Sequence, residues 1–301
     1  MAREWFAKYE SALSEKHAKK LRRYLENTIF PAIGGKPVTQ LEPADFLQIV
    51  QPSERLGHHE TAHKLMRLCG QVTRYARITG RVKYDVAAGL TEALTPVQTT
   101  HFAAVTLPDD IGQLLRDIDA YVGYTSVVYC LKILPYVFTR PSELRLAHWS
   151  EFDFKNATWI IPASRMRMRR EHVVPLSKQV LVLLNELHAY TGNGKLLFPS
   201  ARALTTPISD AAPLAALRRM GYGKETMTLH GFRAMASTRL NELGFRADVI
   251  EAQLAHKEPD TVRLAYNRAE YMDERCRLMQ AWADYLDGLR NRQQKRSKEE
   301  V

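Results

Sequence analysis

A histidine and an arginine lie three residues apart in the segment 228–239, at His230 and Arg233. At helical spacing the two side chains lie on one face, one turn from each other. Arginine presents a planar fork of N–H donors and histidine a donor whose protonation can be tuned, so the pair suits a cluster of anionic oxygens. An isolated match of this kind is more often a pair of solvated surface residues, so the assignment needs further residues.

Three further residues for the same chemistry follow in a fixed order along the chain. Arg140 lies directly before Pro141, a residue typical of the first position of a helix. Its guanidinium is therefore expected at a helix N-terminus, where an anion is favoured, and Glu143 is placed to hold it. With His256 and Tyr266 downstream, the complete order is Arg, His-x-x-Arg, His, Tyr.

These residues and their surroundings resemble the tyrosine recombinases, and more narrowly the integrases of P4-type phages and genomic islands. The shared stretches are Arg-Met-x-Met-Arg-Arg before His-Val-Val-Pro-Leu-Ser, and Ala-Tyr-Asn-Arg-Ala-Glu-Tyr through Ala-Trp-Ala-Asp-Tyr-Leu. The resemblance covers nearly the whole chain, from Glu4 to about Leu286. It implies a site-specific DNA recombinase that cuts and rejoins DNA through a 3′-phosphotyrosyl intermediate and so integrates or excises a mobile element.

The resemblance also implies a role for each residue of the set. Arg140 and Arg233 clamp the non-bridging oxygens of the scissile phosphate, and His256 adds a third donor. His230 assists as a donor or as the acceptor of the tyrosine proton, and Tyr266 is the nucleophile. A phenol with a pKa of about 10 is mostly neutral at pH 7, so the cationic cluster must favour the phenolate as it attacks.

Tyr271 is the rival nucleophile, but it lies further from His256 than the family spacing and falls in a helix-like segment. No cofactor and no metal are expected. The sequence has no Gly-rich phosphate-binding loop and no clustered carboxylates that suggest bound Mg²⁺.

The chain departs from the family at a hairpin that normally carries a lysine, the acid that protonates the leaving 5′-oxygen. The resemblance places Arg167 there, and no lysine lies between Lys155 and Lys178. Arginine holds its proton too tightly to be an efficient general acid. The chain is therefore a slow recombinase, a recombinase that uses a neighbouring donor, or a catalytically weak DNA-binding relic. A nicking enzyme like the type IB topoisomerases shares the cluster, but the P4-like first half of the chain argues against it.

Composition agrees with a DNA-acting protein. The 301 residues carry a net charge of +10, which suits a polyanionic partner. Hydrophobic residues make up 45% of the chain, enough for packed cores, yet no apolar run reaches the roughly 18 residues of a membrane span. The sequence shows no secretion leader, and its three widely spaced cysteines are expected to be buried thiols in a reducing cytoplasm.

Periodicity predicts a mainly helical protein with a small antiparallel sheet, an α+β fold. Residues 1–94 are expected to be all helical, and a linker is expected over 95–105. The resemblance implies that 1–94 form the core-DNA-binding domain and 106–288 the tyrosine recombinase catalytic domain. Three short strands are expected between Glu151 and Ser177, where the hydrophobic period changes to two. The last long helix is expected to end at Gly288, and 289–301 to form a charged, disordered tail.

Basic side chains expected to contact DNA occur in two places. One set lies beside the apolar stripe of the helix predicted over 59–79, and the other lies at the hairpin tip. They are Lys64, Arg67, Arg74 and Arg77 on the helix, and Arg165, Arg169 and Arg170 at the hairpin.

The resemblance implies double-stranded DNA attachment sites as partners, four identical chains on two sites, and DNA-bending and excisionase proteins as accessories. Two roles are open for four residues of the last helix: they contact neighbouring chains in such an assembly, or they pack on their own domain. The residues are Met279, Trp282, Tyr285 and Leu286. P4-type integrases usually begin with an arm-site-binding domain, and this sequence starts at the core-binding domain. It is a natural short form or a fragment.

Arg167→Lys is predicted to speed cleavage of ordinary DNA. General acid help contributes about 10²–10⁴-fold, and an arginine can stabilise negative charge without delivering a proton. Cleavage rates of the two proteins should converge on DNA whose 5′-bridging oxygen is sulfur, since that leaving group needs little protonation. An oxygen substrate that Arg167→Lys cuts no faster would show that another residue supplies the proton.

Overall fold

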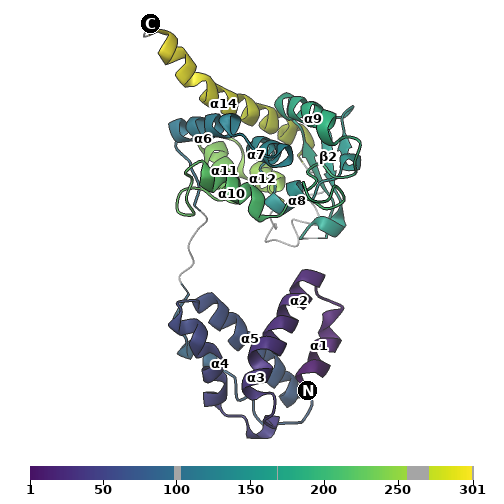
Figure 1. The fold of residues 1–301 in the computed structure, drawn as a ribbon, viewed down its shortest axis with the longest axis vertical. Coiled ribbons are helices and arrows are strands. Elements are labelled where there is room, and N and C mark those ends of the chain that lie inside the picture. The colour runs from purple at the N-terminus through teal and green to yellow at the C-terminus, as the bar shows by residue number, and fades with distance from the viewer. Residues whose placement is uncertain (98–102, 168, 256–270, 300–301) are drawn as a thin grey trace. The chain divides into compact units, whose positions relative to one another are not determined.

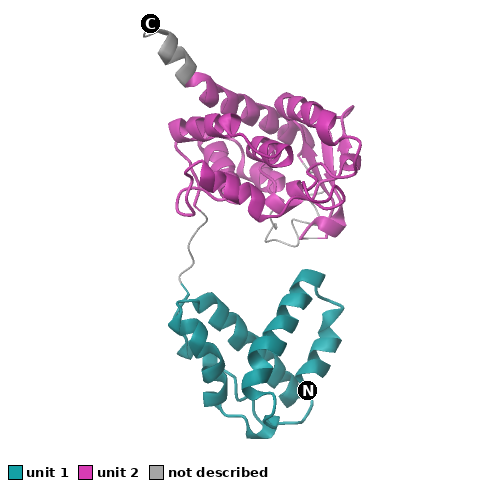
Figure 2. Ribbon diagram, in the orientation of Figure 1, with its two compact units in different colours: residues 1–100 teal, residues 101–301 magenta. Residues whose placement is uncertain are grey.

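The computed structural model describes residues 1–97, 103–167, 169–255 and 271–299, with side chains to residue 292. The chain divides into two compact units, residues 1–100 and 101–301 (Figure 2). The division falls inside the segment 95–105, which the sequence predicts as a linker. The expected fold class is confirmed, since most regular structure is helical and one three-stranded antiparallel sheet is present.

Unit 1 contains only helical elements over residues 1–97 (Figure 1). They are α1 (Ala2–Glu10), α2 (Glu15–Tyr24), a π-helical turn (Leu25–Ile29), α3 (Phe30–Ile33), a 3₁₀ turn (Val38–Gln40), α4 (Pro43–Arg55), α5 (His59–Ile78) and a second 3₁₀ turn (Leu90–Ala93). Helix α5 is the core of the unit, because it packs on α1 and α4 and buries the apolar stripe predicted from its sequence. Gly80 follows it with φ 73°, as expected for a residue that ends a helix.

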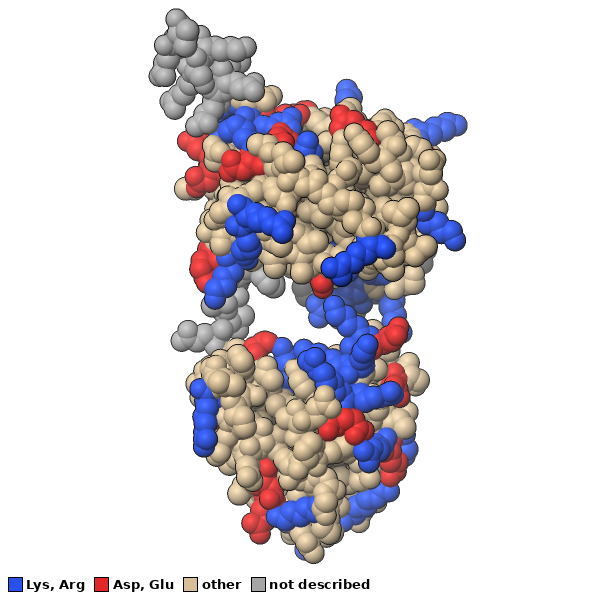
Figure 3. All heavy atoms as spheres, viewed as in Figure 1, with Lys and Arg blue, Asp and Glu red and all other residues tan. Residues whose placement is uncertain are grey.

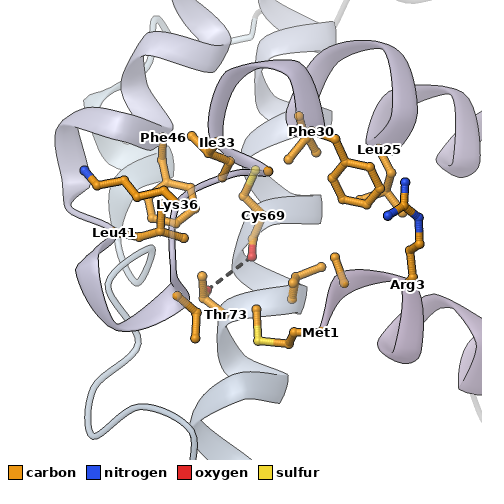
Figure 4. Close-up of a pocket in the computed structure, with 15 residues that line it drawn as sticks. Met1, Arg3, Leu25, Phe30, Ile33, Lys36, Leu41, Phe46, Cys69 and Thr73 are labelled. Carbon is orange, nitrogen blue, oxygen red and sulfur yellow. Dashed lines mark hydrogen bonds between the residues drawn. The ribbon is translucent and has the colours of Figure 1, made fainter.

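A pocket of about 540 Å³ lies among α1, α3 and α5 of unit 1 (Figure 4). Its walls are mainly apolar, with Leu25, Phe46 and Cys69 on them and Arg3 and Lys36 as the charged residues of the lining. The residues that line it also belong in large part to the hydrophobic core of the unit. It is therefore a gap in core packing rather than a polar site.

Unit 2 combines helices with the sheet. Its elements are α6 (Pro108–Ala120), α7 (Thr125–Val137), α8 (Pro141–Arg145), a 3₁₀ turn (Trp149–Glu151), β1 (Phe152–Asp153), β2 (Thr158–Ile161), a 3₁₀ turn (Ala163–Arg165), β3 (His172–Pro175), α9 (Lys178–Thr191), α10 (Ala211–Arg219), α11 (Gly231–Glu242), α12 (Ala247–Gln253) and α14 (Met272–Glu299). The strands pair in the order β1-β2-β3, with Trp159 opposite Phe152 on one side and Val174 on the other.

Helix α7 is the centre of unit 2 (Figure 1). It packs against α6, α8, α9, α10, α11 and α14. Its sequence is apolar on nearly every face, and such a helix is stable only when it is surrounded. The end of α7 leads through Phe138 to Arg140, so the core fixes the start of the candidate site.

One expectation for the C-terminal helix is wrong. Helix α14 does not end at Gly288, since it continues to Glu299, and Leu289 is 2% exposed. Asp119 on α6 pairs with Arg290, and Arg116 donates to the carbonyl of Leu289. A single glycine costs a helix only about 1 kcal/mol relative to alanine, and these contacts with α6 offset that cost.

The aromatic face of α14 belongs to its own unit. Met279, Trp282 and Leu286 are at most 1% exposed, and the indole N–H of Trp282 donates to the carbonyl of Pro135 on α7 at 2.9 Å. Tyr285 accepts a hydrogen bond from Arg239 on α11. These side chains therefore pack within unit 2, which agrees with the second of the two alternatives. The cysteine expectation is also partly wrong, because Cys69 and Cys130 are buried but Cys276 is exposed.

Gly112→Ala is predicted to destabilise unit 2 by about 1–3 kcal/mol, because the overpacked methyl would force α6 and α14 apart. A Cβ at Gly112 would lie 2.6 Å from the carbonyl oxygen of Leu289. Gly288→Ala, on the facing helix, meets nothing within 4 Å and should stabilise by up to about 1 kcal/mol. Urea unfolding of the three proteins measures both changes. Equal effects of the two substitutions would contradict the close approach.

Candidate active site

Arg140 lies at the N-cap of α8, as its position before Pro141 predicts. Glu143, which is 4% exposed, makes two hydrogen-bond contacts with Arg140. One carboxylate oxygen accepts from the backbone N–H of Arg140 at 2.9 Å, and the other accepts from Nη1 at 2.8 Å. The predicted hold of Glu143 on the guanidinium is therefore present.

Arg233 lies in the first turn of α11 and is 8% exposed. Its Nη1 donates to the carbonyl of Phe138 at 3.0 Å and its Nη2 to the carbonyl of Leu254 at 2.7 Å. Burial, and then the nearby positive charge of Arg140, lower the pKa of Arg233 to about 10. The Arg233 guanidinium therefore remains charged at pH 7, and the structure places it close to Arg140.

Phe138 has a strained backbone, with φ 35° in the left-handed region. A bulky residue adopts this conformation only where its surroundings fix it. Its N–H donates to Leu134 at 2.9 Å, its carbonyl accepts from Arg233, and its ring meets Trp282 edge-on at 6.2 Å. The turn between α7 and Arg140 is therefore held by the core and by the site itself.

The end of α12 supplies acceptors for both arginines. Leu254 O accepts from Arg233, and the next carbonyl, of Ala255, accepts from Nη2 of Arg140 at 3.2 Å. The last carbonyls of a helix have no partner within it and carry partial negative charge. Two guanidiniums that would otherwise repel each other are thus brought to adjacent acceptors.

His230 is the N-cap residue of α11 and is exposed. Partial removal from water, followed by the charges of Arg233 and Arg140, lowers the pKa of His230 below its usual value of 6.5. The imidazole is therefore mainly neutral at pH 7 and can accept a proton. The start of α11 lies close to the backbone of Ala103. This approach requires Gly231, since a Cβ there would lie 2.4 Å from the carbonyl oxygen of Ala103.

The hairpin between β2 and β3 divides its arginines into two kinds. Arg167, Arg169 and Arg170 are exposed. Arg165 points inward, donating to the carbonyl of Glu143 at 2.9 Å and pairing with the carboxylate of Glu151. Its guanidinium links the hairpin to α8, so this geometry favours a structural role over the DNA contact expected from the sequence.

His256 and Tyr266, which the sequence assigns to the site, lie outside the described residues. The described residues therefore bring together Arg140, His230 and Arg233. Within the part of the chain that the structure describes, no group of three His, Cys, Asp or Glu side chains is placed to hold a metal ion.

The expected basic face of α5 is present in unit 1, but acidic neighbours reduce its charge. Arg67, Arg74 and Arg77 are exposed, while Lys64 pairs with Glu60 and Arg74 lies 3.9 Å from Asp85. A second basic surface, which was not predicted from the sequence, lies on α2, where Lys and Arg gather in the space-filling view (Figure 3). Its exposed residues are Lys16, Lys19, Lys20, Arg22 and Arg23, which line a shallow groove with Glu26 and Asn27.

The helical spacing of Lys16, Lys19, Lys20 and Arg23 is the signal that could have identified the α2 surface. His172, which lies beside the site, carried no such signal. It is a buried strand residue, and its partner is the carbonyl of Gln253, 81 residues away.

Solved structures of two integrases share this fold. A lambda integrase fragment, residues 75–356, crystallised as a dimer bound to a COC′ core site, aligns with a TM-score of 0.65 at 15% identity, covering 85% of this chain and 95% of that one. The Tn1549 transposon integrase, residues 82–397, in complex with circular intermediate DNA, aligns at 0.62 and 16% identity, covering 89% and 99%. These similarities establish an integrase fold.

Sequence comparison gives the family. The model of the phage integrase central domain matches residues 1–93, and that of the phage integrase family matches 105–272. The integrase of Enterobacteria phage P4 is 38% identical, over 97% of this chain and 70% of the relative. The prophage integrase IntA of Escherichia coli K12 is 35% identical, over 95% and 69%. The chain belongs to the phage integrase family, and the recognition made from its motifs is confirmed. In the described part of the chain, no helix is long and apolar enough to cross a membrane.

The buried His172 predicts a pH dependence of stability. Burial, and then the positive charge of Arg275, lower the pKa of His172 from 6.5 to about 3, so the unfolded chain binds its proton first. Stability from the neutral ring is present above pH 6.5 and is lost as pH falls from about 6.5 towards 3. Urea unfolding at pH 7 and pH 5 should show a smaller loss for His172→Gln than for the native protein. The same loss in both would contradict the shift.

Proposed function

We propose that this protein is a site-specific DNA recombinase that cuts and rejoins DNA through a 3′-phosphotyrosyl intermediate and so integrates or excises a mobile element. The observation that carries the proposal is the placement of Arg140 and Arg233 on adjacent carbonyls of α12, with neutral His230 beside them. Two fixed cations suit the two non-bridging oxygens of a phosphodiester, whose negative charge must be stabilised in the transition state.

The reaction follows from these roles. The Tyr266 oxygen attacks phosphorus, and its proton passes to His230 or to another acceptor in the site. The bond between phosphorus and the 5′-oxygen breaks, and that oxygen takes a proton from a donor on the hairpin side. The 5′-hydroxyl of another strand reverses these steps, so the phosphate bond energy is kept and no nucleotide is consumed. His256 adds a donor to the phosphate.

Tyr266 is the better candidate nucleophile because Tyr271 is engaged in packing. Tyr271 lies against the core of unit 2, and the guanidinium of Arg246 stands 5.3 Å from its ring centre. These contacts give Tyr271 a structural role at the start of α14.

We infer that the assembly is a tetramer of identical chains on two DNA attachment sites, with DNA-bending and excisionase proteins as possible accessories. Solved integrases that share this fold include a lambda integrase tetramer bound to a Holliday junction. A cytoplasmic location follows from a chromosomal DNA partner. The alternative is a catalytically weak DNA-binding relic, and the exposed Arg167 in place of a lysine is the observation that favours it.

Tyr266→Phe is predicted to abolish covalent attachment to DNA. Attachment-site DNA with a nick beside the cleavage position traps the intermediate, and a denaturing gel of labelled DNA shows the shifted band. Tyr271→Phe is the matched control and should keep the band, because phenylalanine retains the ring that packs against the core of unit 2. A band that survives Tyr266→Phe and disappears in Tyr271→Phe would move the nucleophile to Tyr271. Absence of the band even with the native protein would favour the relic.

Unit 1 is proposed to bind DNA chiefly through α2, with α5 as a second contact. Replacing Lys19, Lys20 and Arg23 by Ala should reduce the slope of log K against log salt by about 0.9 for each phosphate that is no longer neutralised. The matched control replaces Arg67, Arg74 and Arg77, and its slope should change less, since acidic neighbours already reduce the charge of α5. Titration of labelled DNA at several salt concentrations measures both slopes. A larger change in the control would assign the main surface to α5.

A further inference from the structure

Three buried polar side chains meet beside the arginine pair and have no role in the chemistry above. They come from three elements: His172 on β3, Gln253 at the end of α12 and Arg275 in the first turn of α14. Their exposed fractions are 8%, 1% and 2%. Burying polar groups at this depth costs free energy unless each finds partners, so the group needs an explanation.

The contacts within the group join the three elements. Nε2 of His172 is 3.1 Å from the carbonyl oxygen of Gln253, and Nε of Arg275 donates to the side-chain oxygen of Gln253 at 2.9 Å. Arg275 also donates through Nη2 to the carbonyl of Val173, the residue after His172. Gln253 is thus held through its backbone by β3 and through its side chain by α14.

The carbonyl that His172 holds is the first of three consecutive acceptors. Gln253 O, Leu254 O and Ala255 O meet His172, Arg233 and Arg140 respectively. All three stand at the end of α12, where the helix supplies no N–H for its last carbonyls. Side chains from three other elements take the place of the missing helical turn.

His172 can fill its place only as a neutral donor. Removal of the ring from water, and then the positive charges of Arg275, Arg233 and Arg140, lower the pKa of His172. A neutral imidazole with its proton on Nε2 donates to Gln253 O. The contact therefore holds at neutral pH without adding a third cation beside the arginines.

We propose that His172, Gln253 and Arg275 are positioning residues that fix the end of α12, so that its next two carbonyls aim Arg233 and Arg140 at the scissile phosphate. None of the three needs to touch DNA. The effect is geometric: misplacement of catalytic groups by about 1 Å can cost about 10²-fold in rate. The inference rests on the proposed function, because it assigns the arginines to phosphate oxygens.

The test compares two substitutions at position 172 on two substrates. His172→Leu removes the donor, whereas His172→Gln keeps an N–H at the same reach. One nicked attachment-site DNA carries an ordinary scissile phosphodiester. The other carries a methylphosphonate at the scissile position, and each of its two stereoisomers is tested. In a methylphosphonate a methyl group replaces one anionic oxygen, which removes the negative charge that the arginines stabilise.

On the phosphodiester, His172→Leu should slow formation of the covalent complex about 10²-fold, and His172→Gln should restore most of the rate. On at least one methylphosphonate stereoisomer the deficit of His172→Leu should shrink to a few-fold, because misaimed arginines matter less for a neutral group. DNA affinity should stay within a few-fold of native. A merely structural role predicts equal slowing on all substrates, and this result, or an undiminished rate for His172→Leu, would overturn the proposal.

Arg275→Lys decides the question if His172→Leu does not fold. It keeps the buried charge but loses the fork that reaches both Gln253 and Val173, and the same preferential loss on the phosphodiester is expected. Equal loss on all substrates, or no loss, overturns the proposal here too. Arg140→Ala serves as the reference for the proposed function. If it shows no selective loss on the phosphodiester, the arginine clamp itself fails. If Arg140→Ala shows the selective loss on the phosphodiester but the His172 and Arg275 variants do not, the clamp stands and only the positioning role fails.

Discussion

The site depends on the carbonyls at the end of α12. Arg140 and Arg233 carry like charges and would separate if only their mutual repulsion acted. Adjacent acceptors at Leu254 and Ala255 hold one N–H group of each arginine, and the partial negative charge of a helix C-terminus offsets part of the repulsion.

Glu143 is the acidic member of this arrangement, and it sets the net charge of the cluster. A single buried carboxylate beside two guanidiniums leaves the described cluster with excess positive charge, which suits one phosphodiester anion. Arg165 ties the hairpin to the same helix through the carbonyl of Glu143, so the loop that carries Arg167 is anchored to the residues that hold Arg140. The proposed position of the acid and the proposed phosphate clamp are therefore both attached to α8.

The rigidity of the site comes from the core of unit 2. Helix α7 packs against six other helices, and the strained Phe138 at its end is held by Trp282 of α14 and by Arg233. The aromatic face of α14 is buried by this packing.

The sequence by itself determined the helical class, the small sheet and the α8 start at Pro141, and it predicted that Arg140, His230 and Arg233 lie together. These features are local, because a helix start or a His-x-x-Arg spacing is encoded within a few neighbouring residues. Only the tertiary structure decided that Arg165 points inward, that Trp282 is core, that α14 passes Gly288, and that His172 meets Gln253. Those outcomes depend on which side chains meet across distant elements, and neither the hydrophobic period nor the charge of a segment specifies a partner 81 residues away.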